Sequence, residues 1–556
     1  MLRDVEFTKS RELTMRKKLW SPNELALATC LGFTHKEEEA VIKINLNLAT
    51  KVSVMEFLKE AFPRIMNHPS EDDFRRKLLK AIDTRYKEMW ADFEEKGLNT
   101  LGYQDKLYAH QKEGLFNVRN RKCNFISYEQ GLGKTLIAGS ISKMLKVRRT
   151  LIICPASLKH NWLKEMCGPI SQFNEMYISI LDANQRKSII AFQERFVIVN
   201  FESLGKHMKH ILSSDIGHII IDEAVKIKST STRYFKMVHH IVESYPNAKV
   251  TLLSGSPIRN RVSDLFAYLK LVNHPLGQSY AHFLREYAIS TKGRGSSLKI
   301  TGAKNTEVLW RQLSNFMLRK RKDECLDLPP KIYSKLYFEL NEYKDEYERA
   351  VREMIEETGK KVSNSSVHQI NKITSKAKLP GVIEMAEGII DQGEKVVIFS
   401  GYTDTVESLQ AHFGKKAVLV NGAVNSSDRA KRVERFMKDD TCMVFVANTI
   451  SGGMGLTLTS ACNMIFCDFP FSPADLVQAE DRLHRISQHR SVNIYYAICS
   501  DSIDENLYRL IANKAHDASK IIDNKSIDME YSNLAEVLVS ELKEKYGHNK
   551  EVLESK

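Results

Sequence analysis

The run of residues 128–135, Tyr-Glu-Gln-Gly-Leu-Gly-Lys-Thr, constrains this chain more than any other stretch. It follows an apolar run that predicts a strand and leads into an apolar run that predicts a helix. Gly131 and Gly133 have no Cβ, so nearby backbone N–H groups can approach phosphate oxygens, and a helix N-terminus adds partial positive charge. Lys134 is expected to reach the β- and γ-phosphates, and the Thr135 hydroxyl to bind Mg²⁺. The pattern predicts a phosphate-binding loop, with a plain glycine-rich turn as the alternative.

Length, charge and cysteine content narrow the class of protein. The chain has 556 residues, 43% hydrophobic and 27% charged, which suits several globular domains. Its 82 Lys and Arg residues outnumber its 69 Asp and Glu residues, and the net charge of +13 makes a polyanion a natural partner. The 9 cysteines lack metal-binding spacing and predict reduced thiols.

The sequence contains no apolar run of membrane-spanning length and no apolar signal core at its N-terminus. We therefore expect a soluble protein with no membrane partner. Its expected location is the cytoplasm of a bacterial or virus-infected cell, or the nucleus if the source is eukaryotic.

From about residue 98, short apolar runs alternate with helical stretches, the pattern of a parallel α/β sheet. Ligands of such sheets bind beyond the carboxyl ends of the strands, where this chain places small and polar residues. The alternation stops in a charged, basic region and then resumes. We predict an N-terminal accessory region of unknown role, a first lobe, a helical connector or protrusion, and a second lobe with C-terminal helices, at residues 1–97, 98–282, 283–378 and 379–556.

The accessory region gives two clear local signals. Apolar residues alternate with polar ones over residues 42–48, which predicts a strand. Ser70 stands before a helical apolar pattern as a candidate N-cap, and Gly97 is placed to end that helix.

Two adjacent carboxylates follow the apolar run of residues 218–221. Asp222 can hold Mg²⁺ and Glu223 can polarise an attacking water, which phosphoryl transfer to water requires. Acidic pairs also cap helices, but this pair follows a phosphate loop in an α/β pattern, and the catalytic interpretation is therefore favoured.

Residues 478–485, Gln-Ala-Glu-Asp-Arg-Leu-His-Arg, predict a helix in the second lobe. A spacing of three places Arg482 and Arg485 on one face of it. Arginines reaching the γ-phosphate from the second lobe would make hydrolysis depend on lobe closure. The alternative is a surface helix with intrahelical ion pairs.

Taken together, these segments resemble the superfamily-2 helicases, and most closely the Snf-type (sucrose-non-fermenting) ATPases that translocate on double-stranded DNA. The resemblance extends over about residues 107–506 and includes residues 152–158 with Asn161 and Trp162, residues 254–258, and a brace over residues 317–331. It implies an α/β protein with two tandem RecA-like parallel-sheet lobes, and ATP with Mg²⁺ between them.

The resemblance also assigns roles to individual positions. Gln111 is implied to contact the adenine base, and Gly455 to line the nucleotide site. The positions implied to contact the DNA backbone are Ser157, Ser203, Ser400, Gly422, Ser451 and Gly453. The positions implied to couple the two activities are Ser254, Ser256 and Gln478.

The chain departs from the family pattern at a few positions. Val225 stands where the family usually has His, Ser256 where it has Thr, and Thr457 where Asn is common. Hydrolysis needs only Asp222 and Glu223, so we expect altered coupling at most.

The resemblance predicts a DNA-dependent ATPase, or DNA translocase, that works as a monomer on duplex DNA. Backbone contacts carry little sequence information and give steep salt dependence. Protein partners are expected to bind through residues 1–97. The alternatives are a strand-separating DNA or RNA helicase and a non-hydrolysing nucleic-acid scaffold.

Overall fold

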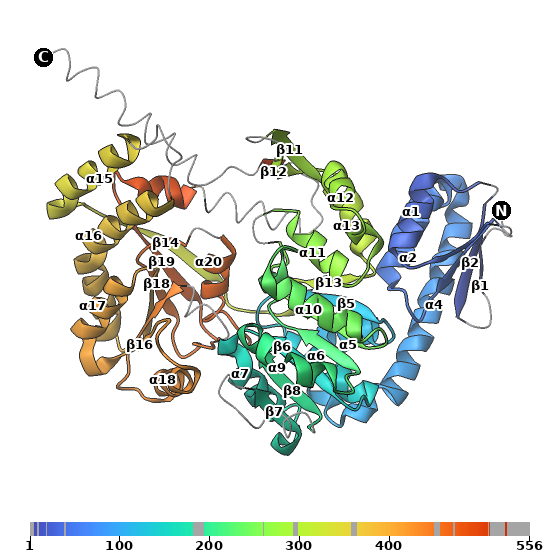
Figure 1. Ribbon diagram of the computed structural model, residues 1–556, viewed down its shortest axis with the longest axis horizontal. Coiled ribbons are helices and arrows are strands. Elements are labelled where there is room, and N and C mark those ends of the chain that lie inside the picture. The colour runs from blue at the N-terminus through green and yellow to red at the C-terminus, as the bar shows by residue number, and fades with distance from the viewer. Residues whose placement is uncertain are drawn as a thin grey trace, which may run out of the picture. The chain divides into compact units, whose positions relative to one another are not determined.

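The computed structural model describes residues 5–7, 11–17, 19–37, 40–181, 194–258, 261–292, 298–356, 364–449, 456–470, 473–509, 511 and 529–530. The chain forms two compact units (Figure 1). The first holds the residues up to Cys325, and the second begins at Leu326.

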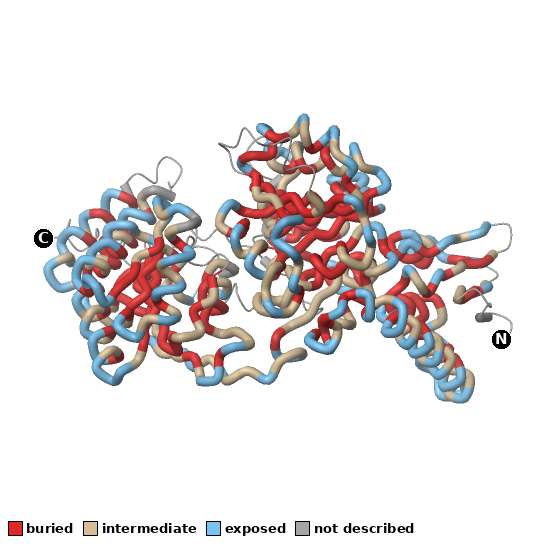
Figure 2. The backbone as a smooth tube through the Cα atoms, turned by 90° about the horizontal axis from the view of Figure 1, so that it is seen from below, coloured by how far each residue is buried: buried red, intermediate tan, exposed pale blue. Residues whose placement is uncertain are grey.

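The first unit is built on a parallel sheet with the strand order β13-β5-β10-β9-β6-β8-β7, counting the strands of the described residues. The strands are β5 (Cys123–Tyr128), β6 (Thr150–Cys154), β7 (Ile178–Leu181), β8 (Phe196–Asn200), β9 (His218–Ile221), β10 (Lys249–Leu253) and β13 (Met317–Lys320). β6, β8, β9 and β10 are buried along their whole length. Figure 2 shows buried backbone in red in the interior of the lobes and exposed backbone in pale blue on their outside. Strands buried on both faces read as continuous apolar runs, which explains why the sequence predicts them.

The helices of this lobe connect its strands and cover the sheet (Figure 1). They are α5 (Ala109–Val118), α6 (Lys134–Leu145), α7 (Lys159–Met166), α9 (Leu204–Leu212), α10 (Arg233–Ser244), α11 (Asp264–Leu271), α12 (Tyr280–Tyr287) and α13 (Thr306–Leu313). An antiparallel hairpin, β11 (Ala288–Lys292) and β12 (Leu298–Ala303), lies between α12 and α13 along the chain.

The N-terminal accessory region folds as an antiparallel sheet with helices. Its sheet has the order β1-β2-β4-β3, formed by Val5–Phe7, Glu12–Arg16, Val41–Asn45 and Thr34–Lys36 respectively. Its helices are α1 (Pro22–Cys30), α2 (Lys51–Ala61), α3 (Pro63–Asn67) and α4 (Asp72–Lys96). The predicted strand is therefore present as β4, and Gly97 is the C-cap of α4 as expected. The expected N-cap is wrong: Glu71 holds that position without a side-chain cap, because Ser70 belongs to a preceding 3₁₀ turn.

Asn315, which lies between α13 and β13, fastens this region to the first lobe. Its Oδ1 accepts a hydrogen bond from the Thr50 N–H at 3.0 Å, and its Nδ2 donates to the Leu31 carbonyl at 2.9 Å. Arg311 of α13 forms an ion pair with Glu60 of α2 at 2.7 Å. The accessory region and the first lobe thus form one unit.

The second unit contains a parallel sheet with the order β14-β19-β18-β15-β17-β16 among its described residues. The strands are β14 (Lys331–Phe338), β15 (Val396–Ser400), β16 (Ala417–Val420), β17 (Val444–Asn448), β18 (Asn463–Phe466) and β19 (Val492–Cys499). Alternate residues of β15 pack into two different cores: Val397 and Phe399 on one face, Val396 and Ile398 on the other.

Helices cover both faces of this second sheet (Figure 1). They are α15 (Lys344–Glu356), α16 (Asn364–Asp391), α17 (Thr403–Phe413), α18 (Ser426–Lys438) and α20 (Pro473–Glu480). The predicted class, two α/β lobes with parallel sheets, is confirmed.

The region predicted as a helical connector, residues 283–378, holds strands as well as helices. β13 is an edge strand of the first sheet and β14 an edge strand of the second, and the two units divide between them, at Cys325 and Leu326. β13 reads Met-Leu-Arg-Lys and β14 is half exposed, so neither has the apolar run that marks a buried strand. The predicted domain boundaries stay predictions.

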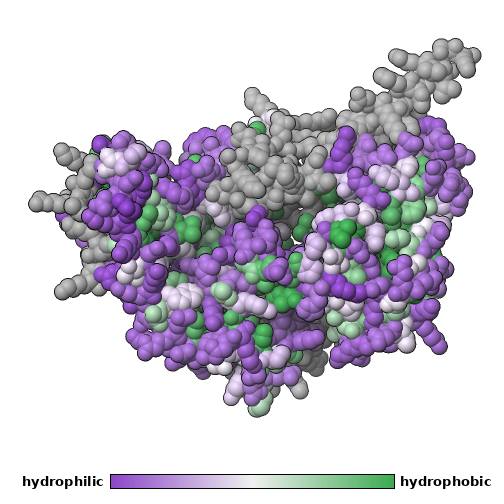
Figure 3. Space-filling view, turned by 180° about the vertical axis from the view of Figure 1, so that it is seen from behind, coloured by the Kyte–Doolittle hydropathy of each residue, from purple (hydrophilic) through white to green (hydrophobic). Residues whose placement is uncertain are grey.

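The surface shown in Figure 3 is mostly hydrophilic, with apolar residues in small separate patches. Among the described residues, no helix combines the length and the hydrophobicity that crossing a membrane requires. All 9 cysteines are free thiols, as their spacing predicts.

One buried ion pair fastens α16 to the segment after β19. Lys378 and Asp504 are 0% and 1% exposed and form a salt bridge. Asp504 also accepts hydrogen bonds from the Thr374 hydroxyl at 2.9 Å and the Cys499 N–H at 3.0 Å. Removing one member of such a pair leaves an uncompensated buried charge, whereas surface pairs contribute little.

We therefore expect Lys378→Met to destabilise the second unit by about 3–5 kcal/mol, because Asp504 loses its counter-charge. Lys372→Met is the matched control on the same helix, since Lys372 and its partner Asp404 are 43% and 58% exposed, and its expected cost is below about 1 kcal/mol. The four Trp residues, Trp20, Trp90, Trp162 and Trp310, lie in the first unit, so urea unfolding should be followed by circular dichroism. Equal losses of unfolding free energy in both variants would contradict the stabilising role of the buried Lys378–Asp504 pair.

Candidate functional site

The predicted phosphate-binding loop has the geometry that its glycines suggest. β5 ends at Tyr128 and α6 begins at Lys134, so strand, turn and helix follow in the expected order. Gly131 and Gly133 have φ angles of 88° and 79°, in the left-handed region that side chains rarely occupy. Gly133 is the N-cap of α6 and offers no side-chain cap, which leaves the first N–H groups of the helix available to an anion.

Lys134 lies over this loop. Its Nζ donates hydrogen bonds to the Tyr128 and Glu129 carbonyls at 2.8 and 3.1 Å. A Cβ added to Gly255, just after β10, would lie 3.5 Å from the same Nζ. The segment after β10 therefore approaches the loop closely, and a side chain at position 255 would crowd the lysine.

Asp222, directly after β9, is a buried carboxyl held by two hydrogen bonds. Trp162 Nε1 donates to its Oδ2 and the Glu223 N–H to its Oδ1, both at 2.8 Å. Burial, and then the charge of Glu223, raise the pKa of Asp222 to about 7, while Trp162 and Lys134 act in the opposite direction. Lys134 and Asp222, which the sequence assigns to one site, are thus close enough to interact electrostatically.

Glu223 has a φ of 48°, so a left-handed residue ends the strand next to Asp222. Such a conformation costs about 1–3 kcal/mol for a residue with a side chain and is often retained where function requires a particular direction. The backbone at Asp222 and Glu223 therefore forms a turn whose conformation is constrained.

Gln111 contacts the phosphate loop directly. Its Oε1 accepts from the Tyr108 N–H at 3.1 Å, and its Nε2 donates to the Leu132 carbonyl at 3.4 Å. A Cβ at Gly133 would lie 2.3 Å from that Nε2, so the second glycine also makes room for Gln111. The position lies beside the site as expected, and its contact with adenine stays a prediction.

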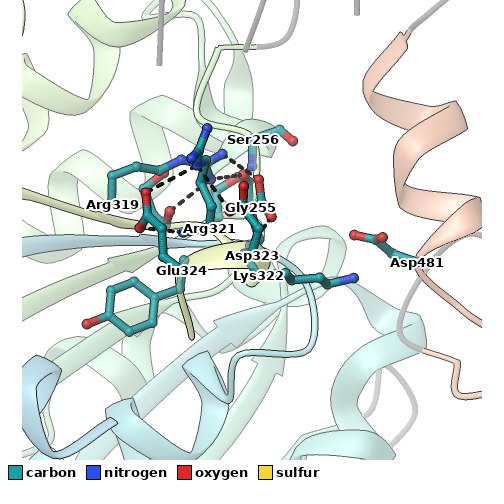
Figure 4. Close-up of polar contacts among 12 residues, drawn as sticks. Gly255, Ser256, Arg319, Arg321, Lys322, Asp323, Glu324 and Asp481 are labelled. Atoms are coloured by element: carbon teal, nitrogen blue, oxygen red, sulfur yellow. Dashed lines mark hydrogen bonds and ion pairs between the residues drawn. The ribbon is translucent and has the colours of Figure 1, made fainter. Parts of the chain in front are cut away.

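The coupling segment after β10 is attached to the phosphate loop by Arg319 of β13. Arg319 Nη1 donates to the Ser127 and Gly255 carbonyls, each at 3.1 Å, and Nη2 pairs with Glu129 at 2.8 Å (Figure 4). Within the segment, the Ser256 N–H donates to the buried Ser254 Oγ at 3.3 Å. Ser254 and Ser256 thus belong to the loop's surroundings.

The positions implied to contact DNA differ in exposure. Ser157 is half-buried and Gly422 is exposed. Ser203 and Ser400 are buried: Ser203 Oγ donates to the Asn200 carbonyl at 3.2 Å, and Ser400 Oγ donates to Asp468 at 2.5 Å. Their hydroxyls face inward in this structure, because each closes the turn that follows its strand. The two remaining DNA positions, Ser451 and Gly453, lie outside the described residues, and so does Gly455, which is implied to line the nucleotide site.

The helix predicted over residues 478–485 is wrong in its second half. α20 ends at Glu480, and the following residues form turns in which the Arg482 N–H bonds to the Ala479 carbonyl at 3.0 Å. Arg482 is 1% exposed, and its Nε donates to the Gln478 carbonyl at 2.9 Å. Glu480 and Asp481, at the point where the helix gives way to turns, form ion pairs with Lys331.

Arg485 lies on the same turn. Its Nη1 donates to Thr457 Oγ1 at 2.6 Å and its Nε to the Asp481 carbonyl at 3.1 Å. Arg482 Nη1 donates to the Leu456 carbonyl at 3.3 Å, so the structure brings both arginines next to residues 456 and 457 within the second unit. Gln478 contacts Arg482 through its backbone carbonyl.

Sequence reasoning missed four residues that organise these elements: Glu129, Trp162, Arg319 and Lys331. Trp162 falls in a segment that the resemblance assigns to DNA contacts, yet its indole N–H binds Asp222. Glu129 lies within the run of the predicted phosphate loop, but no role was assigned to it. Arg319 and Lys331 lie in the segment that the resemblance identifies as a brace, and the structure shows their side-chain partners.

No cluster of three or more His, Cys, Asp or Glu side chains able to hold a metal occurs among the residues the structure describes. Mg²⁺ usually keeps several waters and binds through one or two carboxylates plus substrate phosphates. Thr135 at the start of α6 and the carboxyl of Asp222 suit a metal of that kind.

Comparison with known proteins identifies two matching families. The family described as the SNF2-related domain matches residues 110–385, and the helicase conserved C-terminal domain matches residues 380–487. A solved structure, the Sulfolobus solfataricus SWI2/SNF2 ATPase core in complex with dsDNA, is 23% identical with a TM-score of 0.36, covering 79% of this chain and 96% of its own.

Three curated relatives are 25–27% identical to this chain over the regions that match. The SWI/SNF-related matrix-associated actin-dependent regulator of chromatin subfamily A-like protein 1 homolog of Caenorhabditis elegans is 25% identical, over 74% of this chain and 61% of the relative. The DNA annealing helicase and endonuclease ZRANB3 of Homo sapiens is 27% identical, over 74% of this chain and 40% of the relative. An uncharacterized ATP-dependent helicase of Mycoplasma pneumoniae is 26% identical, over 75% of this chain and 42% of the relative.

The matched region thus spans 40–61% of the length of these relatives. Two family matches that follow one another along residues 110–487, together with the ordered motifs and two parallel-sheet lobes, agree on one assignment. The chain belongs to the Snf-type ATPases of helicase superfamily 2.

Proposed function

We propose that this protein is a DNA-dependent ATPase that uses ATP hydrolysis to move along double-stranded DNA, remodelling DNA structures or displacing bound proteins. The observation that carries the proposal is the glycine loop that sets Lys134 within electrostatic range of the buried Asp222. The names of two relatives, an annealing helicase and an ATP-dependent helicase, support the same class of activity.

In the proposed reaction, the N–H groups at the start of α6 and the Lys134 ammonium hold the ATP phosphates. Lys134 exchanges its bonds to the Tyr128 and Glu129 carbonyls for phosphate oxygens. Thr135 and Asp222 hold Mg²⁺, which neutralises charge that develops on the phosphates. Glu223 orients and polarises the attacking water.

Arg482 and Arg485 of the second unit add positive charge at the γ-phosphate, the role of an arginine finger. Arg482 is almost fully buried, so this role requires a rearrangement of the turn after α20. Gln478, whose carbonyl holds Arg482, is proposed to couple that rearrangement to the rest of the lobe.

DNA contacts in this proposal go to the phosphate backbone. The half-buried Ser157 of the first unit and the exposed Gly422 of the second are accessible for them. Ser203, Ser400, Ser451 and Gly453 are the other positions proposed for such contacts. Binding is then weakly dependent on sequence and steeply dependent on salt. The net charge of +13 is consistent with such a partner.

Duplex DNA should stimulate ATP hydrolysis more than single-stranded DNA or RNA. Lys134→Ala should reduce turnover by about a hundredfold or more, because the negative charge on the ATP phosphates loses the lysine ammonium that neutralises it. Lys146→Ala is the control, since Lys146 is the exposed C-cap of the same helix. Phosphate release with each nucleic acid is the measurement. Wild-type protein that hydrolyses no ATP with any of them would favour the scaffold alternative.

Displacement assays distinguish the proposed duplex translocase from the alternative of a strand-separating helicase. A translocase that follows duplex DNA displaces the third strand of a triplex and leaves the two duplex strands annealed. Efficient release of a single strand from a DNA or RNA duplex would instead favour the strand-separating helicase.

The pKa of Asp222 yields a pH-dependent expectation. The hydrogen bond from Trp162 lowers that pKa, so Trp162→Phe should raise it and leave less carboxylate to bind Mg²⁺ near neutral pH. The acid limb of the ATPase pH profile should move to higher pH, and more Mg²⁺ should be needed at pH near 6.5, a value of the order of the raised pKa.

Trp20→Phe is the matched control, because Trp20 is a buried tryptophan whose Nε1 donates to the Ala40 carbonyl at 3.0 Å in the accessory region. Its pH profile should match the wild type. Identical acid limbs in Trp162→Phe and wild-type protein would show that Asp222 does not hold the metal.

A further inference from the structure

Two clusters of ionic contacts lie at the two ends of residues 321–330, the segment between β13 of the first unit and β14 of the second. Each cluster joins a cation of an edge strand to carboxylates next to a proposed catalytic element of the same unit. We call them the loop anchor (Glu129 and Arg319) and the turn anchor (Lys331, Glu480 and Asp481).

In the loop anchor, Glu129 binds the end of β13 at three points. Its Oε1 pairs with Arg319 at 2.8 Å, and its Oε2 accepts from the Lys322 N–H at 2.9 Å. Its own N–H donates to the Lys320 carbonyl at 3.0 Å. Glu129 is the first residue after β5 and belongs to the phosphate loop, so the start of segment 321–330 is fixed to that loop.

Arg319 extends the loop anchor to the coupling segment. Its side chain is 9% exposed, and its other terminal nitrogen binds the carbonyls of Ser127 and Gly255. Figure 4 shows Arg319 of β13 together with Gly255 and Ser256 of that segment. A planar guanidinium can serve these separate acceptors at once, which a lysine ammonium at the same place cannot.

In the turn anchor, Lys331 at the start of β14 binds Glu480 at 2.9 Å and Asp481 at 3.1 Å. The three side chains are 16%, 4% and 7% exposed. Burial alone would lower the pKa of Lys331, but Asp481 and Glu480 raise it above its usual value, so the ammonium stays charged.

The same turn carries both proposed arginines. The Tyr496 hydroxyl donates to Glu480 at 2.7 Å, and the Asp481 carbonyl accepts from Arg485 Nε at 3.1 Å. Lys331 therefore fixes the acidic pair from which the Arg482–Arg485 turn continues. A displacement of β14 at this point is transmitted to the arginines.

We propose that Arg319 and Lys331 are positioning residues for ATP hydrolysis, each attaching one end of segment 321–330 to one half of the catalytic machinery. This proposal rests on the proposed ATPase function. The segment is thereby linked to the phosphate loop at one end and to the arginine turn at the other. Any change that nucleic acid binding makes in the segment reaches both.

The test uses full-length protein and steady-state ATPase kinetics with saturating duplex DNA. Lys331→Met should lower kcat about tenfold while changing KM for ATP less than about threefold, because the arginines act on the transition state and not on ground-state binding. Lys331→Arg, which keeps the charge, should retain kcat within about threefold of wild type.

The matched control is Lys335→Met on the same strand, where the Lys335 ammonium lies 4.7 Å from the Tyr508 ring and outside the turn anchor. Its kcat should equal that of the wild type. The proposal is overturned if Lys331→Met turns over at the wild-type rate, or if Lys331→Arg loses as much activity as Lys331→Met.

The loop anchor is tested with Arg319→Lys. We expect a fall in the ratio of DNA-stimulated to basal turnover, because a lysine cannot hold Glu129 and both carbonyls together. Lys320→Met is the control, since Lys320 forms a more exposed pair with Glu113. A stimulation ratio equal to wild type in Arg319→Lys would overturn this half of the proposal.

Two further measurements, thermal unfolding and wild-type ATPase activity, separate a failure of the positioning proposal from unfolding of a variant and from failure of the proposed function. Thermal unfolding within about 2 °C of wild type shows that a kinetic change does not come from unfolding. Wild-type protein that hydrolyses no ATP would reject the proposed function itself, whereas active wild type with unaffected variants rejects only the positioning roles.

Discussion

The buried carboxyl of Asp222 is the constraint on which the nucleotide site depends. It follows β9, a strand of one histidine and three isoleucines that is buried throughout. A buried carboxylate is costly unless hydrogen bonds and opposite charge compensate for it. The fold supplies Trp162 from α7 and Lys134 from α6. Both helices follow strands close to β9, in the order β5-β10-β9-β6, so strand order is what brings these groups together.

The fold was largely predictable where strands are buried on both faces. Among the apolar runs that alternate with helical stretches after about residue 98, those that end before Pro155, Phe201, Asp222 and Ser254 are strands of one parallel sheet. The edge strands β13 and β14 gave no such signal, because each pairs on one side only among the described residues and carries charged residues. A local cap rule also failed at Ser70, where a 3₁₀ turn takes up the residues that would have begun the helix.

The candidate site was predictable in its first lobe and less so in its second. The glycine turn and the acidic pair are local sequence features, and Lys134 lies close enough to Asp222 to lower the pKa of that carboxyl. The helix expected around Arg482 ends at Glu480, where Glu480 and Asp481 form ion pairs with Lys331, a residue about 150 positions away along the chain that the local pattern does not reveal. Serines 203 and 400 were assigned by resemblance, and only the structure shows that their hydroxyls serve the protein's own turns. Burial and distant pairing are properties that a linear pattern does not contain.

The same edge strand that binds the phosphate loop is also bound by the accessory region. Asn315 lies two positions before β13, and its amide is shared between Thr50 and Leu31 of that region. Arg121, close to the start of β5, donates to the Leu48 carbonyl at 3.1 Å, so β5 and β13 are both held at the end of the sheet opposite the loop. A rigid strand pair transmits displacement along its length, because its hydrogen-bond register is fixed. Residues 1–97 are therefore attached to the two strands that lead into Glu129 and Arg319.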